Sequence, residues 1–206
     1  SGSYAETGQQ IQAEWAPDGQ SVVFAAATRR NAAAYAQVAT HLYQASLSGG
    51  EPKQITSGEE SYADPRFRPD GRALYCSFTR VSNNPYSLDR LAMFAWPGLG
   101  ERTIVTGSFA RSVNSFAFTP DSSTIYLTAE DAGHEIIYSL PAGGGEVRPA
   151  FEVKSGVYTQ LSISGKASAP ILIASWESAA NPSEVVRVDP AAGKHVNLTT
   201  FNVDRI

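Results

Sequence analysis

A turn sequence recurs three times after an aromatic residue: WAPDG at residues 15–19, FRPDG at 67–71 and FTPDS at 118–122. Successive prolines of this turn are 52 and 51 residues apart. A fixed period of this length is typical of solenoid and propeller repeats rather than of one mixed domain. Asp-Gly forms tight hairpin turns at low steric cost, because glycine tolerates positive φ angles. The recurrence therefore predicts an array of β-sheets.

Each repeat is predicted to contain four antiparallel strands in the same order. β-Branched and aromatic residues fill the runs between the turns, as is typical of strands. The fourth repeat lacks the Pro-Asp-Gly turn but keeps the order. The expected strands are 11–16, 21–26, 41–47 and 53–56; 64–67, 73–78, 90–95 and 103–106; 115–118, 124–129, 135–140 and 147–151; and 160–165, 171–176, 184–188 and 196–199.

These repeats predict an all-β chain that forms a β-propeller of about four blades, each with four antiparallel strands. A lone sheet is marginally stable and gains stability by packing its apolar face on the next sheet. One aromatic residue per repeat, Trp15, Phe67 and Phe118, is expected to pack between sheets. Residues 31–37, with four alanines, are expected to form a short helical turn. We expect one partial propeller domain over 1–206, with blades at 9–57, 58–107, 108–152 and 153–202 and a linker starting at 203–206.

Composition favours a soluble globular chain in the cytoplasm or periplasm. The 206 residues are 42% hydrophobic and 17% charged, which is enough for a sizeable core. The longest apolar runs are about six residues, whereas a membrane helix needs roughly 20. A net charge of −4 without a Lys/Arg cluster argues against nucleic-acid binding. The single cysteine, Cys76, leaves the redox compartment open.

The residues that most often carry chemistry show no catalytic or metal-binding pattern. His41, His134 and His195 are far apart in the sequence, whereas zinc sites usually include closer ligand pairs. The adjacent carboxylates at 59–60 and 130–131 are expected to be solvated turn residues rather than an acid–base pair, because neighbours on a strand point to opposite faces. We therefore expect no catalytic residue, cofactor or metal site in this chain.

Further motifs resemble known propeller repeats. The Pro-Asp-Gly unit between strands, the Ile-Thr and Leu-Thr pairs at 55–56 and 198–199, and the Gly-Gly-Glu turns at 49–51 and 144–146 are similar to the TolB-type repeat. The order of three further segments resembles the end of the propeller in S9 (prolyl oligopeptidase) family serine peptidases, in the acylaminoacyl-peptidase and dipeptidyl-peptidase branches. Those segments are YSLDRL at 86–91, FAFTPDSSTIY at 116–126 with AEDAG at 129–133, and NPSEV at 181–185 leading to LTTFN at 198–202.

The S9 resemblance implies a ring of seven or eight blades, followed by an α/β-hydrolase domain that carries a Ser-Asp-His triad. This chain contains no Gly-x-Ser-x-Gly, the motif that presents the nucleophilic serine of such a domain. The resemblance therefore implies a non-catalytic propeller segment of an oligopeptide, dipeptidyl or acylaminoacyl peptidase, which gates substrate access and packs on the hydrolase domain. The alternative is a TolB-like interaction scaffold without enzymatic activity.

Long connections between strands are the best functional candidates in the sequence. The connections 29–40 and 80–89 exceed the usual hairpin length, and such loops are often functional. Segment 176–182 occupies the corresponding connection of the fourth repeat. The paired-glutamate motif that holds the substrate's amino terminus in the dipeptidyl branch is not recognisable here. The residues expected on a substrate-gating or interdomain surface are Arg80, Tyr86, Arg90 and Glu177.

The expected partners follow from the same resemblance. They are the α/β-hydrolase domain of the same protein and peptide substrates, with neither nucleic acid nor membrane. An open array also leaves apolar faces on its terminal blades, and such surfaces tend to associate. We therefore expect this chain to self-associate through open blade faces.

Overall fold

The computed structural model describes residues 12–28, 31, 35–36, 38–80, 87–151, 153–165 and 171–202. These residues are almost entirely in strands and turns, so the predicted all-β class is confirmed. The chain divides into two compact units. The first unit comprises Ser1–Phe67, Gly71–Ser87 and Ala92–Thr103, and the second comprises Arg68–Asp70, Leu88–Leu91 and Ile104–Ile206.

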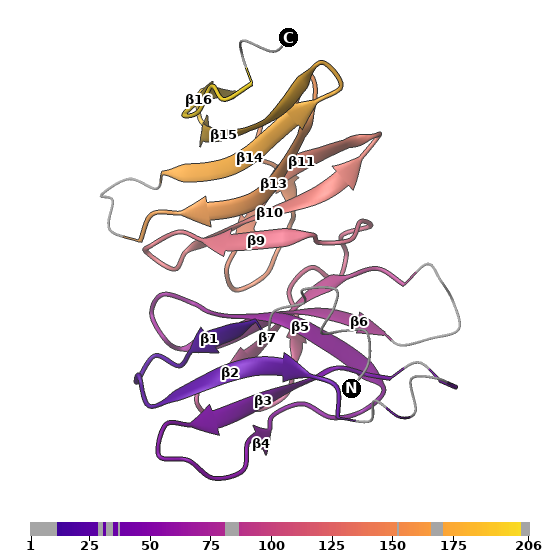
Figure 1. The fold of residues 1–206 in the computed structure, drawn as a ribbon, viewed down its shortest axis with the longest axis vertical. Coiled ribbons are helices and arrows are strands. Elements are labelled where there is room, and N and C mark those ends of the chain that lie inside the picture. The colour runs from indigo at the N-terminus through magenta and orange to yellow at the C-terminus, as the bar shows by residue number, and fades with distance from the viewer. Residues whose placement is uncertain are drawn as a thin grey trace. The chain divides into compact units, whose positions relative to one another are not determined.

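The first two repeats each form a four-stranded antiparallel sheet in which neighbours along the chain are neighbours in the sheet (Figure 1). Most of both sheets belongs to the first unit. The first sheet contains β1 (Ala13–Trp15), β2 (Ser21–Ala26), β3 (His41–Ser46) and β4 (Lys53–Gln54), and the second contains β5 (Glu60–Phe67), β6 (Ala73–Arg80), β7 (Arg90–Ala95) and β8 (Thr103–Ile104).

The face of β5 packs against β2 and β3 of the first sheet. Tyr62 of β5 takes part in this contact. Its amide donates to the Thr40 carbonyl at 2.8 Å. Its ring lies 5.5 Å from that of Phe78 and 6.1 Å from that of Phe94. The guanidinium of Arg102 lies 4.1 Å from the Phe78 ring centroid. An aromatic cluster capped by a cation therefore forms the core of this unit.

The third and fourth repeats make up most of the second unit, and each is again a four-stranded antiparallel meander (Figure 1). The third contains β9 (Ser115–Phe118), β10 (Thr124–Asp131), β11 (His134–Pro141) and β12 (Arg148–Pro149), and the fourth contains β13 (Val157–Ile163), β14 (Leu172–Ser178), β15 (Asn181–Asp189) and β16 (Lys194–Asn197).

The third and fourth sheets are joined, whereas the sequence predicts separate sheets. Glu135 of β11 pairs in parallel with Val157 of β13. The reason is the shortness of β12, which pairs only with Tyr138 and Ser139. The first residues of β11 therefore keep a free edge, and a free edge is a template for another strand.

Apolar side chains between these two sheets form a continuous core. Ile137 of β11 is fully buried and packs with Tyr158 of β13, which is 3% exposed. Burial alternates from residue to residue along β15. Val186 and Val188 are buried, whereas Val185 is 40% exposed. This alternation with a period of two is typical of a sheet with one buried face. The remaining buried members of this core are Leu172 and Ala174.

The repeated turns adopt the predicted conformation. Gly19 and Gly71 have φ angles of 66° and 71°, and Ser122 takes the place of glycine in the third copy with a φ of 63°. The side chain of Asp18 accepts from the amide of Gln20 at 2.9 Å, as expected for aspartate at such a turn. The Ser122 hydroxyl accepts from the amide of Asp70 at 3.0 Å. Serine at this position therefore links two successive turns, although the backbone favours glycine.

Several expected details differ from the structure. β5 begins at Glu60 rather than at residue 64, because its register shift between Ala63 and Arg66 accommodates Asp64 at a φ of 49°. The expectation that Trp15 packs between sheets is wrong, since its side chain is 60% exposed. The expected helical turn at 31–37 lies largely outside the described residues.

Within the described ranges, no helix has the length and apolar character needed to span a membrane.

Candidate functional site

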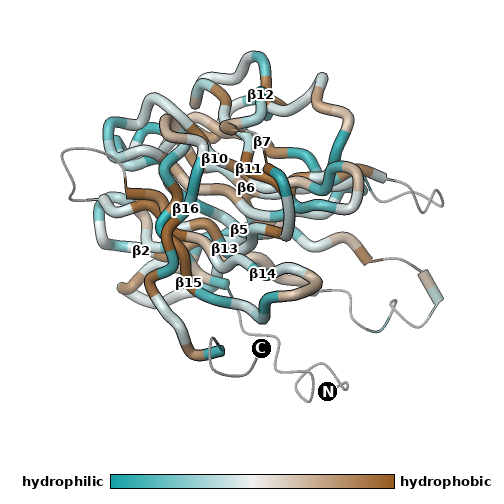
Figure 2. The backbone as a smooth tube through the Cα atoms, turned by 90° about the horizontal axis from the view of Figure 1, so that it is seen from above, coloured by the Kyte–Doolittle hydropathy of each residue, from teal (hydrophilic) through white to brown (hydrophobic). Residues whose placement is uncertain are grey.

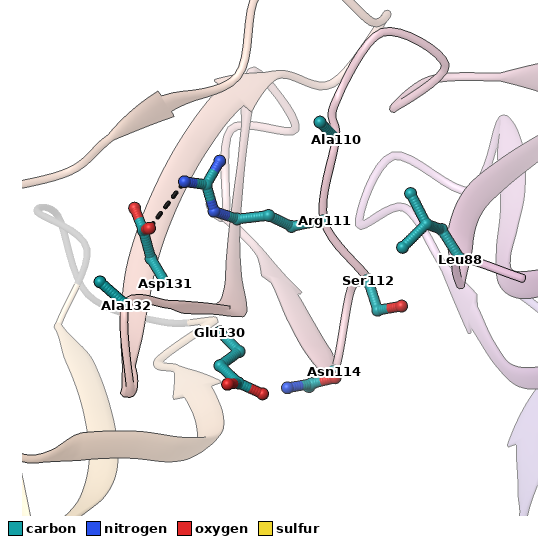
Figure 3. Close-up of a pocket in the computed structure, with 8 residues that line it drawn as sticks. All are labelled: Leu88, Ala110, Arg111, Ser112, Asn114, Glu130, Asp131 and Ala132. Atoms are coloured by element: carbon teal, nitrogen blue, oxygen red, sulfur yellow. Dashed lines mark hydrogen bonds and ion pairs between the residues drawn. The ribbon is translucent and has the colours of Figure 1, made fainter. Parts of the chain in front are cut away.

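A pocket of about 530 Å³ lies in the second unit, beside the hairpin between β10 and β11 (Figure 3). One wall is the end of β10 and its turn, and the other is the segment that leads into β9, together with a residue that precedes β7. The lining residues are Leu88, Ala110, Arg111, Ser112, Asn114, Glu130, Asp131 and Ala132.

A two-residue turn fixes the first wall. Asp131 ends β10 and pairs directly with His134, which begins β11. The two turn residues, Ala132 and Gly133, both have positive φ angles of 51° and 80°. This pattern is that of a type I′ turn, whose twist matches that of the flanking strands. The turn therefore holds Glu130 and Asp131 at a defined position on the pocket rim.

Backbone hydrogen bonds fix the second wall. The amide of Asn114 donates to the carbonyl of Thr128 at 2.9 Å, and the amide of Val113 donates to the carbonyl of Asp89 at 2.9 Å. The amide of Asp89 in turn donates to the Ser112 hydroxyl at 3.1 Å. The segment 111–114 is therefore held by hydrogen bonds on both sides. These bonds fix the positions from which its side chains enter the pocket.

An ion pair between Arg111 and Asp131 crosses the pocket (Figure 3), and the Tyr138 hydroxyl supports it. Nη2 of Arg111 lies 2.6 Å from Oδ1 of Asp131, and the Tyr138 hydroxyl donates to Oδ2 of Asp131 at 3.0 Å. The hydrogen bonds from Arg111 and Tyr138 lower the pKa of the Asp131 carboxyl. Burial, followed by the hydrogen bond to Asp131, raises the pKa of Tyr138 to about 12. Asp131 is therefore ionised at neutral pH and Tyr138 is protonated.

Glu130 is the charged group of the pocket whose carboxylate stays uncompensated. Its side chain is exposed and has no hydrogen-bond or ion-pair partner within the described part of the chain. Its carboxylate and the amide of Asn114 point toward one another in Figure 3. Since Arg111 and Asp131 neutralise each other, the lining carries one net negative charge. The pocket therefore favours a cationic or hydrogen-bond-donating ligand.

The four residues that the sequence marks for a gating surface fall in different parts of the chain. Arg80 is the exposed last residue of β6 and belongs to the first unit. Tyr86 lies outside the described residues. Arg90 and Glu177 belong to the second unit, and neither lines the pocket.

Arg90 has a local structural contact. Its guanidinium donates to the carbonyl of Thr106 at 2.9 Å and also to the carbonyl of Phe109. These bonds satisfy two backbone acceptors in the segment that leads to the pocket. Arg90 therefore helps to hold the backbone of this segment in place.

Glu177 lies in line with the pocket rim. It pairs with Val157, which pairs with Glu135, and Glu135 pairs with Glu130. These four residues form one row across adjacent strands, which are about 4.8 Å apart. The hairpin that carries Glu177 is tight, because β14 ends at Ser178 and β15 begins at Asn181. The expected connection at 176–182 is therefore too wide, because only residues 179 and 180 lie between the two strands.

The histidines are not gathered into a metal site. Nδ1 of His134 lies 3.2 Å from the carbonyl oxygen of Gly156, and Nδ1 of His195 lies 2.7 Å from the Tyr158 hydroxyl. Burial lowers the pKa of His195. Across the described ranges, no three His, Cys, Asp or Glu side chains converge in a way that would hold a metal ion.

Of the carboxylates expected in turns, Glu59 lies at a bend before β5, whereas the other three lie on strands. Glu60 begins β5 and accepts from Arg102 at 3.4 Å, while Glu130 and Asp131 end β10. The sequence did not single out Arg111, Asn114 or Tyr138. No local motif marks them, and only the return of the chain from residue 111 to 131 brings them together.

Comparisons with known proteins concern the sequence and the fold of this chain. No family model matches the chain. The chain is 25% identical over 190 residues to dipeptidyl-peptidase 5 of Porphyromonas gingivalis, and the alignment covers 91% of this chain and 27% of that protein. The chain thus spans about a quarter of the length of this relative.

Two solved structures share the fold. An acylaminoacyl peptidase in complex with Z-Gly-Gly-Phe-chloromethyl ketone has a TM-score of 0.67 at 18% identity, covering 95% of this chain and 28% of its own. TolB from Acinetobacter baumannii has a TM-score of 0.66 at 19% identity, covering 92% of this chain and 43% of its own. At these identities the likeness concerns the fold, and the predicted β-propeller is confirmed.

Proposed function

We propose that this chain, whose propeller is similar to those of S9 family peptidases, is a non-catalytic propeller segment of an S9-like serine peptidase. In this proposal it gates the access of oligopeptides and packs on an α/β-hydrolase domain of the same protein. The observation that carries the proposal is the similarity to dipeptidyl-peptidase 5, because it extends over most of this chain. Peptides are then the substrate class, and the triad lies in the hydrolase domain.

The position of the pocket supports a role in access. In the second unit the hairpins β10–β11 and β14–β15 both join the second strand of a blade to the third. The pairing of Glu135 with Val157, and of Val157 with Glu177, places both hairpins at the same end of the sheets. The pocket opens beside the first of them (Figure 3). Loops at one end of a rigid scaffold are a common location for substrate contacts.

A double substitution tests the gating proposal. In the full-length enzyme, Arg80→Ala with Glu177→Ala is expected to raise kcat/KM for peptides longer than the preferred length by about threefold or more, because both exposed side chains narrow the entrance. The measurement is kcat/KM for a peptide length series. The hydrolase domain supplies the chemistry, so kcat for the shortest good substrate should not change.

The matched control is Arg148→Ala with Glu146→Ala. These two residues form an exposed ion pair, at 71% and 69% side-chain exposure, near the end of β11 that is opposite the β10–β11 hairpin. The control removes the same two side-chain types, and we expect it to leave the length preference unchanged. If both double variants and the parent enzyme show the same dependence of kcat/KM on peptide length, the proposed gating role is wrong.

The end of the described chain is fastened to the fourth blade. Glu184 of β15 is 6% exposed, and its carboxylate accepts from the amide of Asn202 at 2.8 Å and from the Thr199 hydroxyl. The hydrogen bond from Thr199 is the main cause of a lowered pKa of Glu184. A fixed exit supports the part of the proposal in which residues 203–206 begin a linker toward the next domain.

Self-association through an open blade face is also part of the proposal. The face of β15 and β16 opposite the core exposes three apolar side chains, Val185, Val196 and Leu198, at 40%, 49% and 53%. They lie on one face because Val196 pairs with Arg187, two residues from Val185, and the Leu198 amide donates to the Val185 carbonyl. Figure 2 shows hydrophobic residues in part of β15.

Sedimentation velocity over a wide concentration range tests this expectation. The 206-residue chain is expected to form dimers or larger species, and Val196→Glu with Leu198→Glu is expected to shift it toward monomer, because charges on this face oppose its burial. Val185 stays unchanged in this variant. Circular dichroism shows whether the variant keeps its sheet structure. A parent chain that is monomeric at every concentration would contradict the expectation.

A TolB-like scaffold without an attached enzyme is the second candidate, and the fold shared with TolB favours it. The two candidates differ in the protein that follows Ile206 in the gene. A hydrolase domain with Gly-x-Ser-x-Gly supports the peptidase, whereas a stop codon or a further repeat supports the scaffold.

A further inference from the structure

We propose that the pocket beside the β10–β11 hairpin binds a basic side chain, lysine or arginine, of a peptide, with Glu130 as its charge partner. This inference rests on the proposed function and deepens it, because it names the kind of peptide that the loop end would receive. The site needs a net charge, a wall for the aliphatic part of the side chain and a fixed geometry, and each is present.

The charge of the pocket selects a cation. Both carboxylate oxygens of Asp131 already accept hydrogen bonds, from Arg111 at 2.6 Å and from Tyr138 at 3.0 Å. Asp131 is therefore occupied, and its charge is balanced by Arg111. The carboxylate of Glu130 has no such partner among the residues that the structure describes. An anionic ligand would have to displace Asp131 from Arg111, whereas a cation meets Glu130 directly.

The pairing of two glutamates across the β10–β11 hairpin also favours a bound cation. Glu130 of β10 lies directly opposite Glu135 of β11 in the antiparallel register. The Cβ atoms of such a pair are about 5 Å apart, and two like charges at this distance destabilise the hairpin. A bound ammonium or guanidinium group near Glu130 lowers this repulsion. The hairpin therefore gains stability when the pocket holds a cation.

The remaining lining residues suit a long basic side chain. Leu88, Ala110 and Ala132 supply apolar surface, along which the methylene groups of lysine or arginine can lie while the charged end stays near water. The side-chain amide of Asn114 lies on the side toward Glu130, with its nitrogen nearer the Glu130 carboxylate (Figure 3). One uncompensated carboxylate beside an apolar wall matches a basic side chain better than a small metal ion, which needs closely converging ligands.

The part of the pocket formed by Arg111 and Asp131 is already ordered without a ligand. The Arg111–Asp131 pair is held by the Tyr138 hydroxyl, and the guanidinium of Arg111 lies 6.0 Å from the ring centroids of Phe109 and Tyr138. A wall that does not have to be ordered on binding lowers the entropic cost of binding. Affinity should nevertheless be weak, because the pocket is open and Glu130 is exposed.

The test is an NMR titration of the 206-residue chain with the capped peptide acetyl-Ala-Ala-Lys-Ala-Ala-amide at low ionic strength. Capping removes both terminal charges, so the lysine side chain is the only cation. We expect saturable shifts in the amide signals of residues 110–114 and 130–133. Glu130→Gln should weaken binding about fivefold, since it removes one exposed ion pair and keeps the size of the side chain.

Two matched controls sharpen the result. Glu146→Gln removes a carboxylate that is 69% exposed and outside the pocket, and it should leave the affinity unchanged. The same peptide with norleucine in place of lysine keeps the aliphatic part and should not bind measurably. Retained chemical-shift dispersion in Glu130→Gln shows that the variant is folded.

Three results would overturn the proposal: equal affinity of the parent and Glu130→Gln, equal binding of the norleucine peptide, or saturable shifts confined to other residues. Failure of the gating role is a separate outcome. Lysine peptides could bind through Glu130 while Arg80→Ala with Glu177→Ala leaves the length preference of the full enzyme unchanged. That result would support the binding site and contradict the gating role.

Discussion

Gly156→Ala is expected to lower the free energy of unfolding of the second unit by about 3 kcal/mol or more. A Cβ atom at this position would lie 2.4 Å from the carbonyl oxygen of Glu177 and 2.5 Å from Nε1 of Trp176. The φ angle of Gly156 is +80°, which is itself unfavourable for alanine. Backbone and an indole ring cannot move aside cheaply, so β13 and β14 must separate locally. Urea denaturation followed by tryptophan fluorescence measures the loss.

Gly133→Ala is the matched control for this prediction. Gly133 has the same φ of +80°, but an added Cβ there would meet no atom within 4 Å. Its substitution should therefore cost about 1 to 2 kcal/mol, the conformational part alone. The difference between the two variants isolates the steric contribution at Gly156. Equal losses would show that Gly156 is not sterically required.

Ile137→Ala is expected to lower the free energy of unfolding by about 3 kcal/mol, within the range for large-to-small substitution in a core. Ile137 is fully buried between the third and fourth sheets, where it packs with Tyr158 and Val186. Removal of three carbon atoms leaves a cavity that the two sheets cannot close without losing the Glu135–Val157 pairing. The change in the urea midpoint at constant m-value measures this effect.

Ile171→Ala is the control for the core prediction, because it makes the same chemical change at a side chain that is 41% exposed. Its cost should stay below about 1 kcal/mol. We also expect Ile137→Ala to shift the unfolding of both sheets together, since they share one core. A separate transition for the fourth sheet would contradict that expectation.

The strand order of this protein could be predicted because its determinants are local. The Pro-Asp-Gly turns fix the hairpins, and the strand bounds Ser21–Ala26, Arg90–Ala95 and Ser115–Phe118 agree with the expected ranges. The positive φ at Gly19 and Gly71 follows from glycine itself. The sequence predicts that this strand starts at Asp64-Pro65, whereas β5 starts at Glu60 and its partner strand β6 holds the register through a bulge.

The candidate site could not be predicted in the same way. The sequence selected exposed charges near expected long connections, and Arg90 proved to hold the backbone at Thr106 and Phe109. The pair Arg111 and Asp131 is 20 residues apart and belongs to no motif. Glu130 was expected in a turn because it is one of two adjacent carboxylates, yet it ends a strand and faces a pocket.

The sequence by itself determined the repeat, the four-strand order and the turn conformations, since these depend on residues within a few positions of one another. Only the tertiary structure decided that the third and fourth sheets join at Glu135 and Val157, that Glu130, Glu135 and Glu177 lie in one row, and that Arg111 neutralises Asp131. The physical reason is that register and long-range contacts depend on how free strand edges and apolar faces find partners, and no local propensity encodes that choice.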